Sequence, residues 1–171
     1  AIQLPLHKIA MIKGSGVDLS EYAYQSEPED GVCFIVMAAR LLREKGVYQF
    51  IEAARILKHR KIPAQFLLVG EPDPGNPNSV SERELEDWKR EGIVKILGFR
   101  SDIPKIFSCS NVVVLPSFYG EGLPKVLIEA AACGRPIITT DNPGCKEAVV
   151  DGITGIVVPI KDGAKLASAI E

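Results

Sequence analysis

The stretch "NVVVLPSFYGEGLPKVLIEAAACGRPIITT", residues 111–140, decides the fold. It opens and closes on the segments 111–116 and 136–140, which are rich in β-branched and other apolar residues and are predicted to be strands of the sheet. Between them lies a helical segment with signals at both ends. Pro124 suits the first turn, where no N–H partner is needed, and Gly134 ends the helix. The stretch therefore predicts a strand–helix–strand unit of a parallel sheet.

The same alternation of apolar runs and helical segments extends in both directions from this unit. Further strands are expected at residues 7–12, 33–39, 64–70, 94–98 and 155–159. Further helices are expected at 46–60, at 81–92, directly after Asp102, around 146–150 and from 162 onward. Strands that alternate with helices through short loops indicate the α/β class, with one open parallel sheet and helices on both faces.

Composition narrows the class of protein. With 171 residues the chain can form one well-cored domain, and its formal net charge of −2 argues against nucleic acid as a partner. The four cysteines lack close spacing, which favours free thiols in a reducing compartment over disulfides or a metal framework. No segment approaches the ~20 apolar residues of a membrane span. The chain starts without Met and stops soon after its last helix begins, so we expect a domain cut from a longer protein.

In an open parallel sheet, ligands bind beyond the carboxyl ends of the strands. This rule selects the loops at 13–18, 39–46, 70–80, 98–102, 116–123 and 140–145. In the first of them, Gly14, Ser15 and Gly16 let the backbone approach a ligand closely and present N–H groups to an anion. A tight turn without a ligand explains these three residues equally well.

Cations follow the strand expected at 33–39. Arg40, Arg43 and Lys45 lie between this strand and the next helix, a position well suited to phosphate. The alternative is a solvated basic loop. We expect the stem of Arg40 to be partly buried, because it comes directly after an apolar run, and this favours the phosphate interpretation.

Two carboxylates stand out in the deciding stretch. Glu121 belongs to the loop before the helix, whereas Glu129 lies within the helix among apolar residues. A buried carboxylate requires a partner. An exposed i,i+4 pair with Lys125 would satisfy Glu129, but the apolar surroundings leave little room for an exposed stripe. A hydrogen bond to the hydroxyls of a bound ribose is the interpretation we favour.

A metal centre is not expected. His7 and His59 are far apart in the sequence, and the chain contains no Asp-x-Asp pair. The segment "EPD", residues 71–73, resembles such a pair only loosely, and the prolines around it favour a plain loop role.

The loops together resemble those of a known family. The segments "GSGVD", "ARLLREKG", "LVGEPDPGNP", "ILGFRSDIP", "LPSFYGEGLPKVLIEAAACGRPIITTDNPGCKE" and "DGITGIVVP" occur in the same order in retaining glycosyltransferases of family 4. The resemblance is to the bacterial branch that builds surface polysaccharides and lipid-linked oligosaccharides. It implies the GT-B fold, in which two Rossmann-like domains face each other across a cleft. Residues 1–171 resemble the carboxyl-terminal, nucleotide-sugar-binding domain, and the acceptor-binding domain is absent.

The resemblance also implies roles for individual residues. Arg40 and Lys45 would hold the donor diphosphate, and Glu121 would bind hydroxyls of the donor sugar. Glu129 would bind the ribose. The remaining expected contacts are made by backbone: sugar and phosphate at Gly122 and Leu123, nucleobase at Phe99 and Arg100, and phosphate near the turn Gly14, Ser15 and Gly16. Many members have Phe-Gly after the first glutamate, whereas this chain has Gly122-Leu123-Pro124, which leaves the identity of the sugar open.

The function implied is transfer of a sugar, with retention, from a nucleotide diphosphate sugar to a saccharide or lipid-linked acceptor in cell-surface polysaccharide biosynthesis, such as lipopolysaccharide. The donor would be UDP-linked, with an N-acetylhexosamine favoured, and neither a metal nor another cofactor is expected. The location implied is the cytoplasm, with peripheral association at the inner face of the membrane through the missing domain. The isolated domain is expected to be inactive. The alternative is a non-catalytic nucleotide-binding or scaffolding module.

Overall fold

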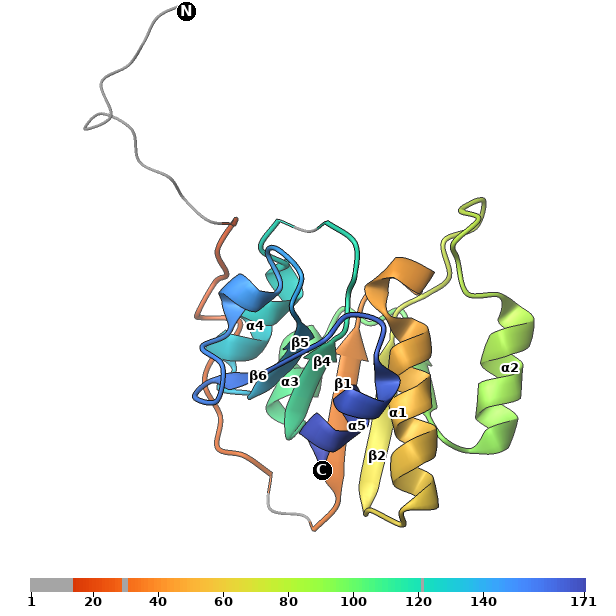
Figure 1. Ribbon diagram of the computed structural model, residues 1–171. Coiled ribbons are helices and arrows are strands. Elements are labelled where there is room, and N and C mark those ends of the chain that lie inside the picture. The colour runs from red at the N-terminus through yellow and green to blue at the C-terminus, as the bar shows by residue number, and fades with distance from the viewer. Residues whose placement is uncertain (1–13, 29–30, 121) are drawn as a thin grey trace, which may run out of the picture.

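Six parallel strands form a single sheet in the computed structural model, which describes residues 14–28, 31–120 and 122–171 (Figure 1). The strand order is β3-β2-β1-β4-β5-β6, and every neighbouring pair is parallel. The strands are β1 (Cys33–Ala38), β2 (Ala64–Val69), β3 (Lys95–Gly98), β4 (Val112–Leu115), β5 (Ile137–Thr140) and β6 (Gly155–Val158). The open parallel sheet expected from the sequence is confirmed, and the strand expected at 7–12 lies outside the described residues.

The helices occupy the connections between strands, as the sequence predicts. They are α1 (Val47–His59), α2 (Glu82–Glu91), α3 (Ile103–Ser108), α4 (Lys125–Ala132) and α5 (Gly163–Ile170). Two short 3-10 helices, Arg43–Lys45 and Lys146–Ala148, lie in loops. The second lies within the short helical segment expected around 146–150 and is confined to its first three residues. No helix of the described ranges is long and apolar enough to cross a membrane.

The strand order reverses direction between β1 and β4, and this reversal determines which face of the sheet each helix covers. The chain runs outward from β1 to β3, returns to pair β4 with the other side of β1, and continues to β6. Because such crossovers are right-handed, α1, which connects β1 to β2, and α4, which connects β4 to β5, cover opposite faces of the sheet, and α5, which follows β6, returns to the face of α1. Figure 1 shows α1 and α5 side by side on one face. Residues of β1 lie at the centre of the core: Ile35, Val36 and Met37 are fully buried.

Two glycines bring the strand-end loops close together at the reversal point. Gly70 follows β2 with a φ of 133°, and a Cβ atom there would lie 1.9 Å from the carbonyl oxygen of Ala39. Gly46 precedes α1 with a φ of 82°, and a Cβ atom there would lie 2.1 Å from the carbonyl oxygen of Pro116. Only glycine permits both the positive φ and this close approach. The loops after β1, β2 and β4 therefore meet at one edge of the sheet.

The cysteines are free thiols. Cys133 and Cys145 are buried, Cys33 is partly buried and Cys109 is exposed. Burial raises the pKa of the Cys133 thiol, which keeps it protonated at neutral pH. This agrees with the expectation of thiols that are not paired as disulfides.

Candidate functional site

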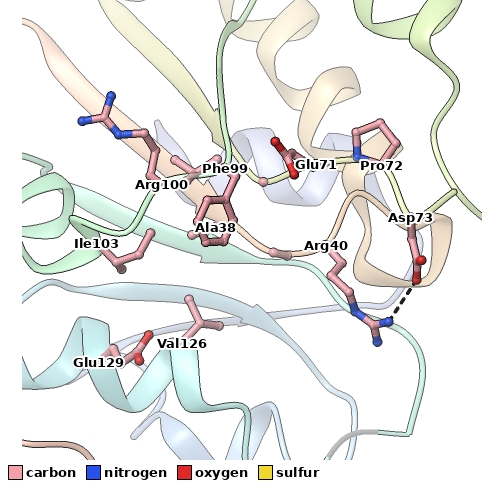
Figure 2. A pocket seen from close by; sticks show the side chains of 13 residues that line it. Ala38, Arg40, Glu71, Pro72, Asp73, Phe99, Arg100, Ile103, Val126 and Glu129 are labelled. Carbon is pink, nitrogen blue, oxygen red and sulfur yellow. Dashed lines mark hydrogen bonds and ion pairs between the residues drawn. The ribbon is translucent and has the colours of Figure 1, made fainter.

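A cavity of about 400 Å³ opens at the carboxyl ends of β1, β2 and β3, and α4 forms its opposite wall (Figure 2). It lies where the strand order reverses, the place at which open α/β sheets bind ligands. The residues that line it are Ala38, Ala39, Arg40, Val69, Gly70, Glu71, Pro72, Asp73, Phe99, Arg100, Ile103, Val126 and Glu129.

Arg40 lies at the mouth of this cavity, on the side of the strand ends. Its Nη1 is 3.1 Å from Oδ2 of Asp73, and the two side chains are 67% and 34% exposed. The expectation that the stem of Arg40 is partly buried is wrong. The strand ends at Ala38, and the ion pair with Asp73 turns the side chain outward rather than against the sheet. The guanidinium is consequently accessible to a ligand.

Asp73 belongs to the "EPD" segment, residues 71–73, for which the sequence favours a plain loop role. Glu71, Pro72 and Asp73 all line the cavity, and the backbone N–H of Asp73 donates to Oγ of Ser79 at 2.8 Å. This bond holds the loop after β2 in place. The rule that ligands bind at the carboxyl ends of strands selects this loop, so its place beside the cavity has a signal in the sequence.

Aromatic and apolar side chains form the part of the cavity near β3. Phe99 follows β3 directly and is 71% exposed, and Ala38, Ile103 and Val126 complete this apolar surface (Figure 2). An exposed aromatic ring at the mouth of a cavity can stack on a planar ligand group. Of the two residues predicted to meet a nucleobase, both Phe99 and Arg100 line the cavity.

The side chain of Arg100 is held by its neighbour Asp102. Two nitrogens of the guanidinium donate to the two carboxylate oxygens of Asp102 at 2.7 and 2.6 Å. This hydrogen bonding lowers the pKa of Asp102 and raises that of Arg100. Asp102 occupies the N-cap position of α3, as predicted, but its side chain pairs with Arg100 and makes no cap hydrogen bond.

Glu129 lies on α4 at the opposite wall of the cavity and is 9% exposed. Its Oε1 accepts a hydrogen bond from the hydroxyl of Tyr22 at 2.9 Å and lies 3.4 Å from Nζ of Lys125. The i,i+4 pair with Lys125 is therefore present, but on a buried carboxylate that faces the cavity rather than on an exposed stripe. The two interpretations of Glu129 offered by the sequence do not exclude each other.

Tyr22 is a partner of Glu129 that sequence reasoning missed. It is 9% exposed, and burial, followed by the hydrogen bond to Glu129, raises the pKa of Tyr22 to about 12. The hydroxyl therefore stays protonated and donates at neutral pH. The two residues are 107 positions apart, and no local pattern in the sequence links them.

The glycine turn reaches the start of α4 but does not line the cavity. A Cβ atom on Gly14 would lie 3.2 Å from the Cβ atom of Leu123, so these two predicted residues are in contact. Ser15 and Gly16 line a neighbouring hollow of about 450 Å³, together with Lys125 and Tyr22.

Gly122 has open space around its Cα, and Glu121 lies outside the described residues. The structure thus brings the turn, Leu123 and Lys125 together beside the main cavity.

Lys45 is placed near the loop after β4 and does not line the cavity. It ends the 3-10 helix Arg43–Lys45, whose Glu44 carbonyl accepts hydrogen bonds from the backbone N–H of Phe118 at 3.0 Å and from Oγ of Ser117 at 3.1 Å. These bonds fix the 3-10 helix against the loop that leads to Glu121. Arg43 is engaged elsewhere, because its guanidinium lies 4.7 Å from the ring centre of Tyr48.

The cavity combines an accessible cation, an apolar surface with an aromatic ring, and a fixed carboxylate. These are the groups that recognise an anion, a planar ring and a hydroxyl-bearing moiety, respectively. Among the described residues there is no group of three or more His, Cys, Asp or Glu side chains that could hold a metal ion. That a metal is not needed stays a prediction.

Comparison with known proteins identifies the family of this chain. The family model of glycosyl transferases group 1 matches residues 33–171. An N,N'-diacetylbacillosaminyl-diphospho-undecaprenol alpha-1,3-N-acetylgalactosaminyltransferase of Campylobacter jejuni is 35% identical over 96% of this chain and 44% of its own length. A UDP-Gal:alpha-D-GlcNAc-diphosphoundecaprenol alpha-1,3-galactosyltransferase of Escherichia coli is 30% identical over 91% of this chain and 42% of its own length.

Solved structures share the architecture. HepE of Anabaena in complex with UDP superimposes with a TM-score of 0.76 at 27% identity, covering 91% of this chain and 45% of HepE. HepE in complex with UDP-glucose gives a TM-score of 0.75. The chain spans less than half the length of these relatives. It belongs to the glycosyl transferases group 1 family and has the Rossmann-like α/β fold of one half of a GT-B glycosyltransferase.

Proposed function

We propose that this chain is the donor-binding domain of a retaining hexosyltransferase and binds a UDP-linked sugar in the cavity at the carboxyl ends of β1, β2 and β3. The observation that carries the proposal is the arrangement of accessible Arg40 and buried Glu129 on opposite sides of one cavity with Phe99 at its mouth. The cavity volume of about 400 Å³ suits a small-molecule ligand. The UDP and UDP-glucose complexes of HepE support the choice of donor.

Each part of the donor has a proposed partner. The nucleobase lies against Phe99 and the backbone at Arg100, and the ribose hydroxyls donate to Glu129. The diphosphate meets Arg40 and Lys45. The remaining contacts proposed are Glu121 to the sugar hydroxyls, the backbone of Gly122 and Leu123 to sugar and phosphate, and the turn Gly14, Ser15 and Gly16 near the phosphates.

The chemistry follows from these positions. When the glycosyl–phosphate bond breaks, negative charge grows on the leaving diphosphate and positive charge on the sugar ring. Preorganised cations stabilise the first of these charges, and such electrostatic stabilisation can supply much of a rate enhancement. Arg40 and Lys45 take this role in place of a metal ion. We propose that the acceptor attacks on the face from which the phosphate departs, so that the configuration is retained and Glu121 positions the sugar.

The acceptor lies outside this chain. The names of the Campylobacter and Escherichia relatives include undecaprenol-linked acceptors. The chain spans less than half the length of each of these two proteins. We propose that a second domain binds a saccharide or lipid-linked acceptor at the cytoplasmic face of the membrane, in cell-surface polysaccharide biosynthesis. On this view the 171-residue chain alone binds donor but transfers nothing.

Calorimetry with UDP, GDP and ADP tests the binding proposal. We expect binding of UDP to be tightest, because HepE, the solved structure compared above, was determined with UDP. Absence of binding for all three nucleotides would overturn the site and favour a non-enzymatic scaffolding module.

Turnover by the full-length protein tests the role of Lys45. Lys45→Ala should lower turnover by about a hundredfold or more, because one charge that stabilises the leaving group is lost. Lys165→Ala, on the exposed side of α5, is the matched control and should leave turnover unchanged. Wild-type turnover for Lys45→Ala would remove this lysine from the diphosphate site.

A further inference from the structure

Glu129 is held by a tyrosine from a distant part of the chain. The hydroxyl of Tyr22 donates to Oε1 of Glu129 at 2.9 Å, and Nζ of Lys125 lies 3.4 Å from the same oxygen. Both of these contacts are made to Oε1, and within residues 14–28, 31–120 and 122–171 no hydrogen bond to Oε2 is found. A glutamate side chain on a helix has several rotamers, and a hydrogen bond together with an ion pair on one oxygen favours one of them.

Tyr22 belongs to a segment that follows α4 along its length, which we name the α4 strap (residues 14–28). In Figure 1 it runs beside α4 in red to orange. The strap contacts the middle of α4 and the turn that follows it: a Cβ atom on Gly14 would lie 3.4 Å from Ile128, and a Cβ atom on Gly134, just beyond the end of α4, would lie 2.4 Å from the ring of Tyr24. The strap is thereby fixed relative to the helix that carries Glu129.

The inward direction of Tyr22 is built into a local turn of the strap. The backbone N–H of Tyr22 donates to the carbonyl of Asp18 at 3.0 Å, and the carboxylate of Asp18 accepts from the backbone N–H and hydroxyl of Ser20 at 2.8 and 2.7 Å. Within the same strap Leu19 is 68% and Tyr24 is 72% exposed, whereas Tyr22 is 9% exposed. The turn therefore presents one hydroxyl to the core side, where Glu129 needs a donor.

We propose that Tyr22 is a positioning residue that orients Glu129 toward the ribose and so makes the site selective for ribonucleotides over nucleotides that lack the ribose hydroxyls. This inference rests on the proposed function, because it takes the ligand of Glu129 to be a ribose. Tyr22 does not touch the ligand. It acts by occupying Oε1, which leaves Oε2 directed to a hydroxyl donor, and by compensating the desolvation of the carboxylate.

Loss of the Tyr22 hydroxyl should weaken the binding only of nucleotides that carry the ribose hydroxyls. UDP and 2′,3′-dideoxy-UDP differ only at the ribose, and calorimetry with the 171-residue chain compares them directly. Tyr22→Phe removes one hydroxyl and keeps the ring. We expect it to weaken UDP binding roughly tenfold, as for the loss of one hydrogen bond to a charged group, and to leave 2′,3′-dideoxy-UDP binding unchanged.

Two further variants separate positioning from a general effect on the fold. Tyr24→Phe, on the same strap but exposed, should bind UDP like the wild type. In a Glu129→Ala background, Tyr22→Phe should cause no further loss of UDP binding, because the side-chain acceptor that Tyr22 orients is already gone.

The outcomes are distinguishable. An equal loss for both nucleotides in Tyr22→Phe would overturn the proposal, since Tyr22 would then support the whole cavity rather than the ribose contact. Unchanged UDP binding in Tyr22→Phe would also overturn it while leaving the proposed function intact. Failure of the wild-type chain to bind UDP at all would instead overturn the proposed function. If the wild-type chain binds UDP and 2′,3′-dideoxy-UDP with the same affinity, Glu129 does not contact the ribose hydroxyls.

Discussion

The two sides of the cavity hold their charges in opposite ways. On the side of the strand ends, Arg40 is 67% exposed and pairs with Asp73 from a nearby loop. On the side of α4, Glu129 is 9% exposed and is bonded to Tyr22, 107 residues away in the sequence. An exposed ion pair exchanges partners at little free-energy cost, whereas a buried carboxylate with fixed donors is preorganised. The cation can therefore adjust to a diphosphate, while the carboxylate sets the orientation of the ligand.

This difference predicts the largest change in binding on the α4 side. Glu129→Gln keeps the shape of the side chain but removes the charge, and we expect UDP affinity to fall roughly tenfold to a hundredfold. The free energy of unfolding should stay within about 1 kcal/mol of the wild type, because the amide can still accept from Tyr22. Calorimetry and chemical denaturation measure the two quantities.

Glu82→Gln, on the exposed surface of α2, provides the control and should change neither quantity. Gross unfolding of Glu129→Gln would show that the carboxylate stabilises the fold and is not a ligand-binding group. The proposed difference between the two sides of the cavity would then be wrong.

The hydrogen bond on the α4 side also has a pH signature. The pKa of Tyr22 is raised from 10.0 to about 12 by burial and by Glu129, with further contributions from the charges of Glu21 and Cys133. A raised pKa in the folded state means that the stabilisation is fully present below pH 10 and is lost as the pH rises through about 12. Wild-type protein should therefore be more stable than Tyr22→Phe by on the order of 1 to 2 kcal/mol at pH 8.

That difference in unfolding free energy should shrink between pH 10 and pH 12, as denaturation curves at pH 8, 10 and 11.5 would reveal. A difference that stays constant to pH 12 would argue against a buried donor at Tyr22.

The smallest effect is expected on the side of the strand ends. Asp73→Asn removes the partner of Arg40 and a negative charge near the proposed diphosphate. Because exposed ion pairs contribute only ~0 to 1 kcal/mol, we expect UDP affinity to rise by no more than about fivefold and the gain to diminish in high salt. Asp87→Asn removes an exposed ion pair on α2 and serves as the control. A fall in UDP affinity for Asp73→Asn would mean that Asp73 holds Arg40 in its binding position.

The sequence predicted what depends on local patterns. Apolar runs and helix signals located the strands and helices, and the rule for carboxyl ends of strands selected the loops that carry Arg40, Phe99 and Arg100. Local patterns gave a wrong prediction where the exposure of a side chain depends on solvent and on a neighbouring loop. Arg40 was expected to be partly buried because it follows an apolar strand, yet Asp73, from a loop interpreted as plain, draws it outward.

The rest depends on contacts between distant segments. The partner of Glu129 comes from a strap 107 residues earlier, and only folding of the strap along α4 brings Tyr22 to it. The 3-10 helix Arg43–Lys45 likewise ends at Gly46, whose backbone lies against Pro116 in the loop after the neighbouring strand β4. Neither contact has a periodic or compositional signal in the sequence.

The proposed UDP site is the cavity at the carboxyl ends of β1, β2 and β3, where the strand order reverses. A larger hollow of about 580 Å³ lies at the other end of β2 and β3, lined by Val32, Gln65 and Lys95. NMR titration of the labelled chain with UDP distinguishes the two places by the backbone amides that shift. We expect shifts in the loops after β1, β2 and β3, including Arg40 and Gly70, and on α4. Shifts confined to the residues of the larger hollow would contradict the proposed site.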